Sequence, residues 1–226
     1  NHEDIQKYLL AKGVEKPKKK TNKNGEATLT VKTNFDGEVP EPEYYDSSGN
    51  SECGVNQIKH RPVIANEQGA LKNAVVIIDS GPVNAPRSGS VEIDQKNCTF
   101  RPRVSTASIH QTIVFGDKDP QLHNVRGMQQ ENQLFNIQTF EGEHKEYKPE
   151  RPGVLSIQCD IHPWMQGYIY VTNEGPARVT DSDGTVQFRK FPQGTYQLDV
   201  WHPELGTKHQ TITIDESSET LEVTYS

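Results

Sequence analysis

The sequence predicts an all-β protein, and three observations support that prediction. Short apolar segments rich in Val, Ile, Thr and Tyr recur along residues 25–226, and this composition is typical of β-strands. Turn signals rich in Gly, Pro and Asp separate these segments. No long segment after residue 24 shows the apolar spacing of an amphipathic helix. The expected architecture is therefore one or more β-sandwiches.

Residues 1–24 differ from the rest of the chain. They carry seven lysines against three acidic residues, in a chain whose formal net charge is −7. Residues 16–24 are rich in Lys and almost free of apolar side chains, which indicates a linker or tail. We therefore expect a basic N-terminal arm or linker over residues 1–24. The acidic balance of the remainder argues against a general nucleic-acid-binding protein.

The expected strands follow in order. Residues 27–31 alternate apolar and polar side chains, as a half-buried strand does. Residues 74–78 are a continuous, mostly β-branched run, which fits a strand that is buried on both faces. The other expected strands are residues 91–93, 109–115, 154–158, 168–172, 186–188, 196–201, 210–214 and 221–224.

The sequence also disfavours two classes of protein, namely membrane-spanning proteins and enzymes. No apolar run approaches the ~20 residues that a membrane-spanning helix needs, so we expect no transmembrane segment. No Ser/His/Asp order, paired-carboxylate setting or glycine-rich phosphate loop stands out. We therefore do not expect an enzyme.

The chemically informative segment is residues 159–165, with the sequence Cys-Asp-Ile-His-Pro-Trp-Met. It holds one thiol, one imidazole and one thioether within seven residues, and His123 lies in a separate segment upstream. Two His, one Cys and one Met are the ligands of an electron-transfer copper site, with a trigonal His₂Cys plane and a weak axial Met. The sequence therefore predicts a copper site in which a separate loop supplies His123.

Other readings of these residues are weaker. Zinc is the main rival for Cys and His, but structural zinc prefers four Cys or His ligands and seldom involves Met. A dinuclear copper centre would need a second Cys on the loop, and residues 155–167 contain only Cys159. A single Cys, His or Met is usually a core or surface residue, so the prediction depends on the ordered set of four.

The spacing Cys159-x-x-His162-x-x-Met165 resembles an amicyanin-like copper loop of the cupredoxin (blue copper) family, and His123-Asn124 resembles the first-ligand segment of that family. The resemblance implies that His123, Cys159, His162 and Met165 bind one mononuclear type 1 copper. It also implies that Asn124 is a supporting residue that pins the two loops together.

The same resemblance implies an extracytoplasmic one-electron transfer protein whose cofactor is copper. Redox partner proteins are expected to dock near His162, Pro163 and Trp164 across a small, transient interface. The expected localisation is periplasmic or extracellular, with a signal peptide that is absent from this chain and taken to have been removed. One departure from the family pattern is Asp117, where relatives tend to carry Asn.

Cys53 and Cys98 remain once Cys159 is assigned to copper. Two leftover thiols in an extracytoplasmic protein favour a disulfide. A bridge between them would close a loop of about 45 residues and contribute ~3–4 kcal/mol to stability in the loop-entropy account. Two free thiols in a reducing compartment are the alternative.

The C-terminal part carries a second resemblance. The turn at residues 180–184, Thr-Asp-Ser-Asp-Gly, and the strand start at residues 192–196, Pro-Gln-Gly-Thr-Tyr, resemble the carboxypeptidase regulatory-like domain. That domain is a small transthyretin-like β-sandwich. Residues 25–35 and 69–77 resemble its first two strands, so its two halves are expected on either side of the copper region.

These resemblances together predict two β-sandwiches, one inserted into the other. A cupredoxin Greek-key β-sandwich, residues 86–172, is expected to be inserted into a smaller split sandwich made of residues 25–85 and 173–226. Bacterial methylamine-utilisation or plastocyanin-like proteins share this combined pattern. One continuous cupredoxin with extra strands at both ends is the alternative.

Two further hypotheses for the function stay open at this point. The chain could be a structural or assembly subunit of a cell-surface or periplasmic complex, because two sandwiches, polar loops and a basic arm suit a piece of a larger assembly. Its copper site would then be incidental. A copper store or chaperone is a third hypothesis, and it predicts easy release of the metal.

Overall fold

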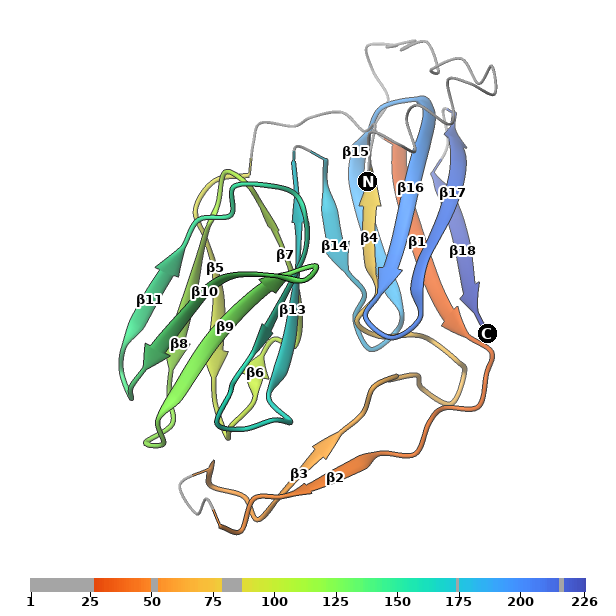
Figure 1. Ribbon diagram of the computed structural model, residues 1–226. Coiled ribbons are helices and arrows are strands. Elements are labelled where there is room, and N and C mark those ends of the chain that lie inside the picture. Colours follow the sequence, from red (N-terminus) through yellow and green to blue (C-terminus); the bar gives the residue numbers. More distant parts are fainter. Residues whose placement is uncertain (1–26, 50–52, 79–86, 174, 216–217) are drawn as a thin grey trace.

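The computed structural model describes residues 27–49, 53–78, 87–173, 175–215 and 218–226. These residues form β-strands and no α-helix, so the predicted all-β class is confirmed. Figure 1 shows two β-sandwiches side by side and a long hairpin that leaves the lower end of one and reaches the lower end of the other. None of the described residues belongs to a helix able to cross a membrane. The predicted basic arm, residues 1–24, lies outside the described residues.

The strands are, in chain order, β1 (Ala27–Phe35), β2 (Glu43–Asp46), β3 (Gln57–His60), β4 (Val75–Ile78), β5 (Ser90–Gln95), β6 (Phe100–Arg101), β7 (Val104–Ser108), β8 (Thr112–Asp117), β9 (His123–Gln129), β10 (Asn132–Thr139), β11 (His144–Tyr147), β12 (Gly153–Gln158), β13 (Gln166–Thr172), β14 (Ala177–Val179), β15 (Thr185–Phe191), β16 (Gly194–His202), β17 (Gly206–Ile214) and β18 (Glu219–Tyr225).

The first sandwich consists of β5 to β13. One of its sheets has the strand order β10-β9-β12-β13-β7, and the facing sheet has the order β11-β8-β5-β6. Buried side chains such as Ile93, Phe115 and Leu155 fill the space between the sheets. Cys159 and Met165 belong to the same buried cluster, so the predicted copper loop is anchored in the core of this sandwich.

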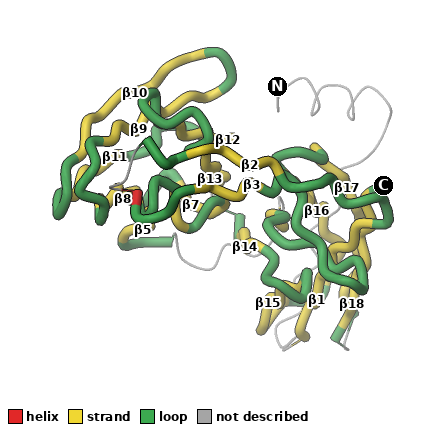
Figure 2. Tube along the Cα trace, turned by 90° about the horizontal axis from the view of Figure 1, so that it is seen from below, coloured by secondary structure: helices red, strands yellow, loops and turns green. Residues whose placement is uncertain are grey.

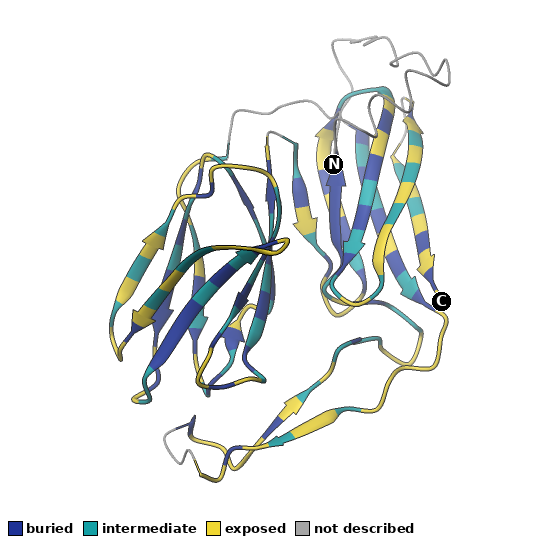
Figure 3. Cartoon of the chain, viewed as in Figure 1, coloured by how far each residue is buried: buried dark blue, intermediate teal, exposed yellow. Residues whose placement is uncertain are grey.

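The second sandwich is built from segments on both sides of the first in the sequence. A three-stranded sheet has the order β15-β1-β18, and a four-stranded sheet has the order β14-β4-β16-β17. Within the latter, Val76 of β4 lies opposite Val200 of β16. Strands from the two sides of the first sandwich in the sequence are therefore neighbours in one sheet. Figure 3 shows that β4 is buried along its length, whereas β17 and β18 alternate between exposed and less exposed residues.

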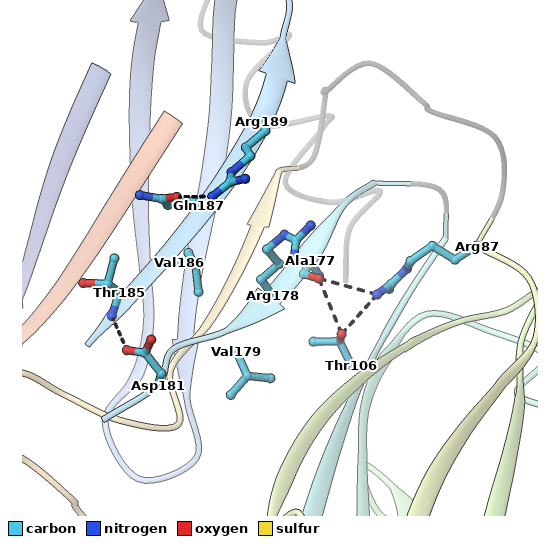
Figure 4. Close-up of a pocket in the computed structure, with 10 residues that line it drawn as sticks. All are labelled: Arg87, Thr106, Ala177, Arg178, Val179, Asp181, Thr185, Val186, Gln187 and Arg189. Atoms are coloured by element: carbon cyan, nitrogen blue, oxygen red, sulfur yellow. Dashed lines mark hydrogen bonds between the residues drawn. The ribbon is translucent and has the colours of Figure 1, made fainter. Parts of the chain in front are cut away.

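The two sandwiches are in contact. Val75 and Ile77 of β4 form a buried apolar cluster with Val104 of β7 and Ala177 of β14. Figure 4 shows Arg87 at this junction: its Nη1 donates to Thr106 Oγ1 of β7 at 3.1 Å and to the Ala177 carbonyl of β14 at 3.5 Å. The first sandwich is therefore held against the second by both apolar packing and hydrogen bonds.

The hairpin formed by β2 and β3 was not expected from the sequence. Seen from below in Figure 2, it runs between the second sandwich and the first. Tyr45 of β2 lies opposite Ile58 of β3, and the Ser47 side chain donates to the Val55 carbonyl at 2.8 Å. The hairpin therefore carries Cys53 to the end of the first sandwich.

One predicted strand has different bounds. The alternating residues 109–115 suggested a single strand, but Ile109 and His110 belong to a turn that precedes β8. The N–H of Gln111 donates to the Ser108 carbonyl at 3.0 Å and closes this turn. His110 is therefore a turn residue.

His202 supplies a prediction for the pH dependence of stability. Its ring is 1% exposed, its Nδ1 accepts the Glu204 N–H at 3.2 Å, and burial lowers its pKa to about 4, helped by the charge of Arg103. In the unfolded chain the pKa is about 6.5, so the unfolded state binds more protons between these values. The stability that the protein gains from keeping His202 neutral is therefore complete above about pH 6.5 and is lost as the pH falls toward 4.

We expect His202 to account for a loss on the order of 2–3 kcal/mol in unfolding free energy between neutral pH and about pH 4. Urea unfolding across this range measures the loss. His202→Asn keeps a hydrogen-bonding side chain that does not titrate, so its stability should fall less steeply with pH. Equal slopes for the variant and the unchanged protein would contradict the assignment.

Candidate metal centre

Three of the four predicted ligands meet at one end of the first sandwich. His123 is the first residue of β9, Cys159 follows β12, and His162 lies in the loop before β13. His123 Nδ1 and His162 Nδ1 are 3.1 Å apart. Cys159 Sγ lies 3.8 Å from His123 Nδ1 and 3.7 Å from His162 Nδ1. Two imidazole nitrogens and a thiol sulfur therefore face a common point.

The surroundings of this point exclude solvent. The exposed fractions of His123, His162 and Cys159 are 0%, 0% and 3%. His123 pairs with Thr139 of β10, so it belongs to a strand rather than to the separate loop that the sequence suggested. A strand position fixes the backbone of His123 more firmly than a loop would.

Met165 lies on the same tight loop as Cys159 and His162. The N–H of Cys159 donates to the Met165 carbonyl at 3.1 Å, and the N–H of Met165 donates to the His162 carbonyl at 2.9 Å. The Met165 side chain is 1% exposed and packs in the core cluster that contains Cys159. Its role as an axial ligand stays a prediction.

The charges at the centre favour a thiolate. Burial raises the pKa of the Cys159 thiol, but hydrogen bonds with His123 and His162 lower it, to about 6. Burial lowers the pKa of His123, but its hydrogen bond with Asp119 and its contact with Cys159 raise it, to about 9. The thiolate is the form of cysteine that binds metals, and a bound cation would take the place of the proton on His123 Nδ1.

Asp119 is a site residue that the sequence analysis did not identify. Its Oδ2 accepts the His123 Nε2–H at 3.1 Å and the Cys98 N–H at 2.8 Å, and its Oδ1 accepts the Asn97 N–H at 2.7 Å. Burial raises the pKa of Asp119, but these three hydrogen bonds bring it below the usual value. A carboxylate held on Nε2 leaves His123 Nδ1 free to face a metal.

Asn124 joins the two segments that carry the predicted ligands. Its Oδ1 accepts the Asp160 N–H at 2.8 Å and lies 3.4 Å from the Cys159 thiol. Its Nδ2 donates to Asp160 Oδ2 and to Asn136 Oδ1, both at 2.8 Å. Asn124 therefore ties β9 and β10 to the loop that begins at Cys159.

The predicted disulfide between Cys53 and Cys98 is present, so that prediction is confirmed. Both cysteines are buried, and their sulfurs and a ring nitrogen of His162 lie within 4.8 Å of one another. Trp164 Nε1 donates to the Cys98 carbonyl at 3.1 Å. The disulfide therefore attaches the β2–β3 hairpin directly beside the candidate metal centre.

The donor set fits a soft or borderline transition metal. Metal ions hold imidazole nitrogen and thiolate sulfur at about 2.0–2.3 Å, and donors at that distance from a shared ion are separated by about the 3.1–3.8 Å seen here. Thiolate and imidazole suit copper and zinc, whereas hard cations prefer carboxylate oxygens. The Asp119 carboxylate beside His123 is engaged by His123 Nε2 and two backbone N–H groups.

Structural comparisons return cupredoxins. A purple cupredoxin from Nitrosopumilus maritimus is 22% identical, with a TM-score of 0.34, and the similarity covers 36% of this chain and 99% of that one. A reduced amicyanin variant is 16% identical, with a TM-score of 0.35, over 44% of this chain and 99% of that one. A copper-containing nitrite reductase from Thermus scotoductus is 20% identical, with a TM-score of 0.34, over 49% of this chain and 25% of that one.

No family model and no curated protein matches the sequence. Each of the structural neighbours described above resembles only part of this chain.

Proposed function

We propose that this protein transfers single electrons through one mononuclear type 1 copper site held by His123, Cys159, His162 and Met165. The observation that carries the proposal is the convergence of two imidazole Nδ1 atoms and the Cys159 sulfur of three buried residues, with separations of 3.1–3.8 Å. Copper in such a site supplies a one-electron couple between Cu(I) and Cu(II).

The residues of this chain hold the donors still and keep water away. Asp119 orients His123, and Asn124 fixes the start of the ligand loop. Side chains that are fixed before the charge changes need little rearrangement when it does. Low rearrangement is what a fast electron carrier requires of its metal site.

We propose a carrier rather than an enzyme. Four protein donors would close the site, whereas catalytic metal sites keep an open position for substrate. The buried disulfide between Cys53 and Cys98 favours an oxidising compartment, which supports a periplasmic or extracellular location.

The proposal extends to the domain organisation. Residues 86–172 would be a cupredoxin domain inserted into a transthyretin-like domain made of residues 25–85 and 173–226. The pairing of β1 with β18 and of β4 with β16 supports this arrangement, because each pair joins strands from the two sides of the insertion.

Copper titration followed by voltammetry tests the function. The expected result is a single copper per chain and a reversible one-electron wave. Protein loaded with zinc serves as the control, because zinc has no redox chemistry. A chain that binds no copper, or that binds copper without a reversible wave, would reject the proposal.

The two methionines of the chain allow a matched test of the axial ligand. Met165→Leu is expected to retain copper and to shift the reduction potential, because only the weak axial bond is removed. Met128, a half-buried residue of β9, is the control, and Met128→Leu should leave the potential unchanged. Voltammetry of both variants measures the difference, and equal potentials would remove Met165 from the ligand set.

A further inference from the structure

His162 does not present its ring to solvent. Its exposed fraction is 0%, and within the part of the chain that the structure describes its Nε2 has no hydrogen-bond partner. The sulfurs of Cys53 and Cys98 lie within 4.8 Å of a nitrogen of this ring. A partner protein therefore cannot touch the His162 ring while the β2–β3 hairpin is in place.

A row of packed rings leads from His162 to the hairpin. The ring centroids of His162 and Trp164 are 5.3 Å apart, and those of Trp164 and Tyr45 are 5.9 Å apart. Both distances are within the range of aromatic rings in direct contact. Trp164 and Tyr45 are both partly exposed, so the row begins at a buried proposed ligand and ends at the surface.

The hairpin that carries Tyr45 is fixed to the first sandwich. The disulfide joins Cys53 to Cys98, Asn97 Nδ2 donates to the Cys53 carbonyl at 3.0 Å, and Trp164 Nε1 donates to the Cys98 carbonyl at 3.1 Å. These links keep Tyr45 against Trp164. Packed side chains couple electron donors and acceptors better than a layer of water of the same thickness does.

We propose that Trp164 and Tyr45 form the electron route between the metal site and the surface of the β2–β3 hairpin. This inference rests on the proposed function. A copper ion held at the site would supply the one-electron couple, and an external one-electron acceptor would take up the electron. The two rings act as the medium for this transfer, so neither ring is oxidised and no bond or proton changes place.

The test measures electron transfer from the reduced copper protein to tris(1,10-phenanthroline)cobalt(III) by stopped flow. Tyr45→Leu should slow the transfer roughly tenfold, which corresponds to about 1.4 kcal/mol of activation free energy. Tyr45→Phe keeps the ring and should restore the rate. Tyr44→Leu is the matched control, because Tyr44 is the neighbouring residue of β2, is 53% exposed and contacts Lys59.

Two results would overturn the route. Equal rates for Tyr45→Leu and Tyr44→Leu would mean that electrons leave elsewhere, for example through the exposed residues Ile161 and Pro163. A faster rate for Tyr45→Leu than for the unchanged protein would mean that the hairpin shields the metal.

Readouts other than the rate separate this inference from the proposed function. All three variants should keep the optical spectrum and reduction potential of the unchanged protein, because neither tyrosine is a proposed ligand. In NMR spectra, Cu(II) should broaden the ring signals of Tyr45 more than those of Tyr44, and the reverse order would contradict the route. An unchanged protein without a copper-thiolate spectrum would reject the proposed function before any rate is compared.

Discussion

Cys159→Ser is expected to abolish the intense visible absorption of the copper-loaded protein while both sandwiches stay folded. The serine hydroxyl remains protonated near neutral pH, whereas the Cys159 thiol has a pKa lowered to about 6 by its hydrogen bonds with His123 and His162 against the effect of burial. The variant therefore lacks the thiolate that would bind copper. Optical spectra after copper loading measure the effect, and circular dichroism reports the fold.

The control for this variant uses the other two cysteines of the chain. Replacing Cys53 and Cys98 together with alanine removes two sulfurs that are joined to each other and are not proposed ligands. That double variant should keep the visible band. An intense band in Cys159→Ser would show that another residue supplies the sulfur ligand, or that the band has another origin.

The same double variant is expected to lower the free energy of unfolding by about 3–4 kcal/mol. The bridge joins residues that are separated by 45 positions, so its removal restores a large loop entropy to the unfolded chain. Equilibrium unfolding in urea under oxidising conditions measures the loss. Both residues are replaced together because a single replacement leaves a buried free thiol.

A second readout follows from the position of the bridge. In the metal-free double variant, the released hairpin should expose His162, which is 0% exposed when the bridge is present. Modification by diethyl pyrocarbonate, located by mass spectrometry, should then increase at His162. If the unfolding free energy of the double variant lay within about 1 kcal/mol of that of the unchanged protein, the bridge would not be a main source of stability, and contacts other than the disulfide would hold the hairpin.

The strands that the sequence predicted are those with strong apolar patterns. Residues 75–78 are β-branched and form a fully buried strand, β4. Strand β10 was missed because most of its residues are at least partly exposed and polar, so it has no clear apolar alternation. The β2–β3 hairpin was missed because its strands are short and mostly exposed, and because its attachment depends on a disulfide to Cys98, a distant residue in the sequence.

The candidate site was likewise predicted from the sequence only in part. The order of His123, Cys159 and His162 predicted that they meet, and the structure brings their donor atoms within 3.1–3.8 Å. Asp119 lies four residues before His123, but that spacing indicates a contact only on a helix. Here a turn between β8 and β9 brings the two side chains together.

The cover over His162 could not be predicted from the loop that carries it. The Cys53 sulfur, which lies within 4.8 Å of a ring nitrogen of His162, comes from a residue more than 100 positions away in the chain. The motif therefore predicts the candidate ligands but not the hairpin that lies over them.

The optical and EPR spectra of the oxidised, copper-loaded protein test the central claim most directly. The His123, Cys159, His162 and Met165 site predicts an intense thiolate-to-copper absorption band in the visible range and the EPR signal of a single Cu(II) per chain. Weak visible absorption, as expected for copper held by nitrogen and oxygen donors alone, would contradict a type 1 copper site at these residues.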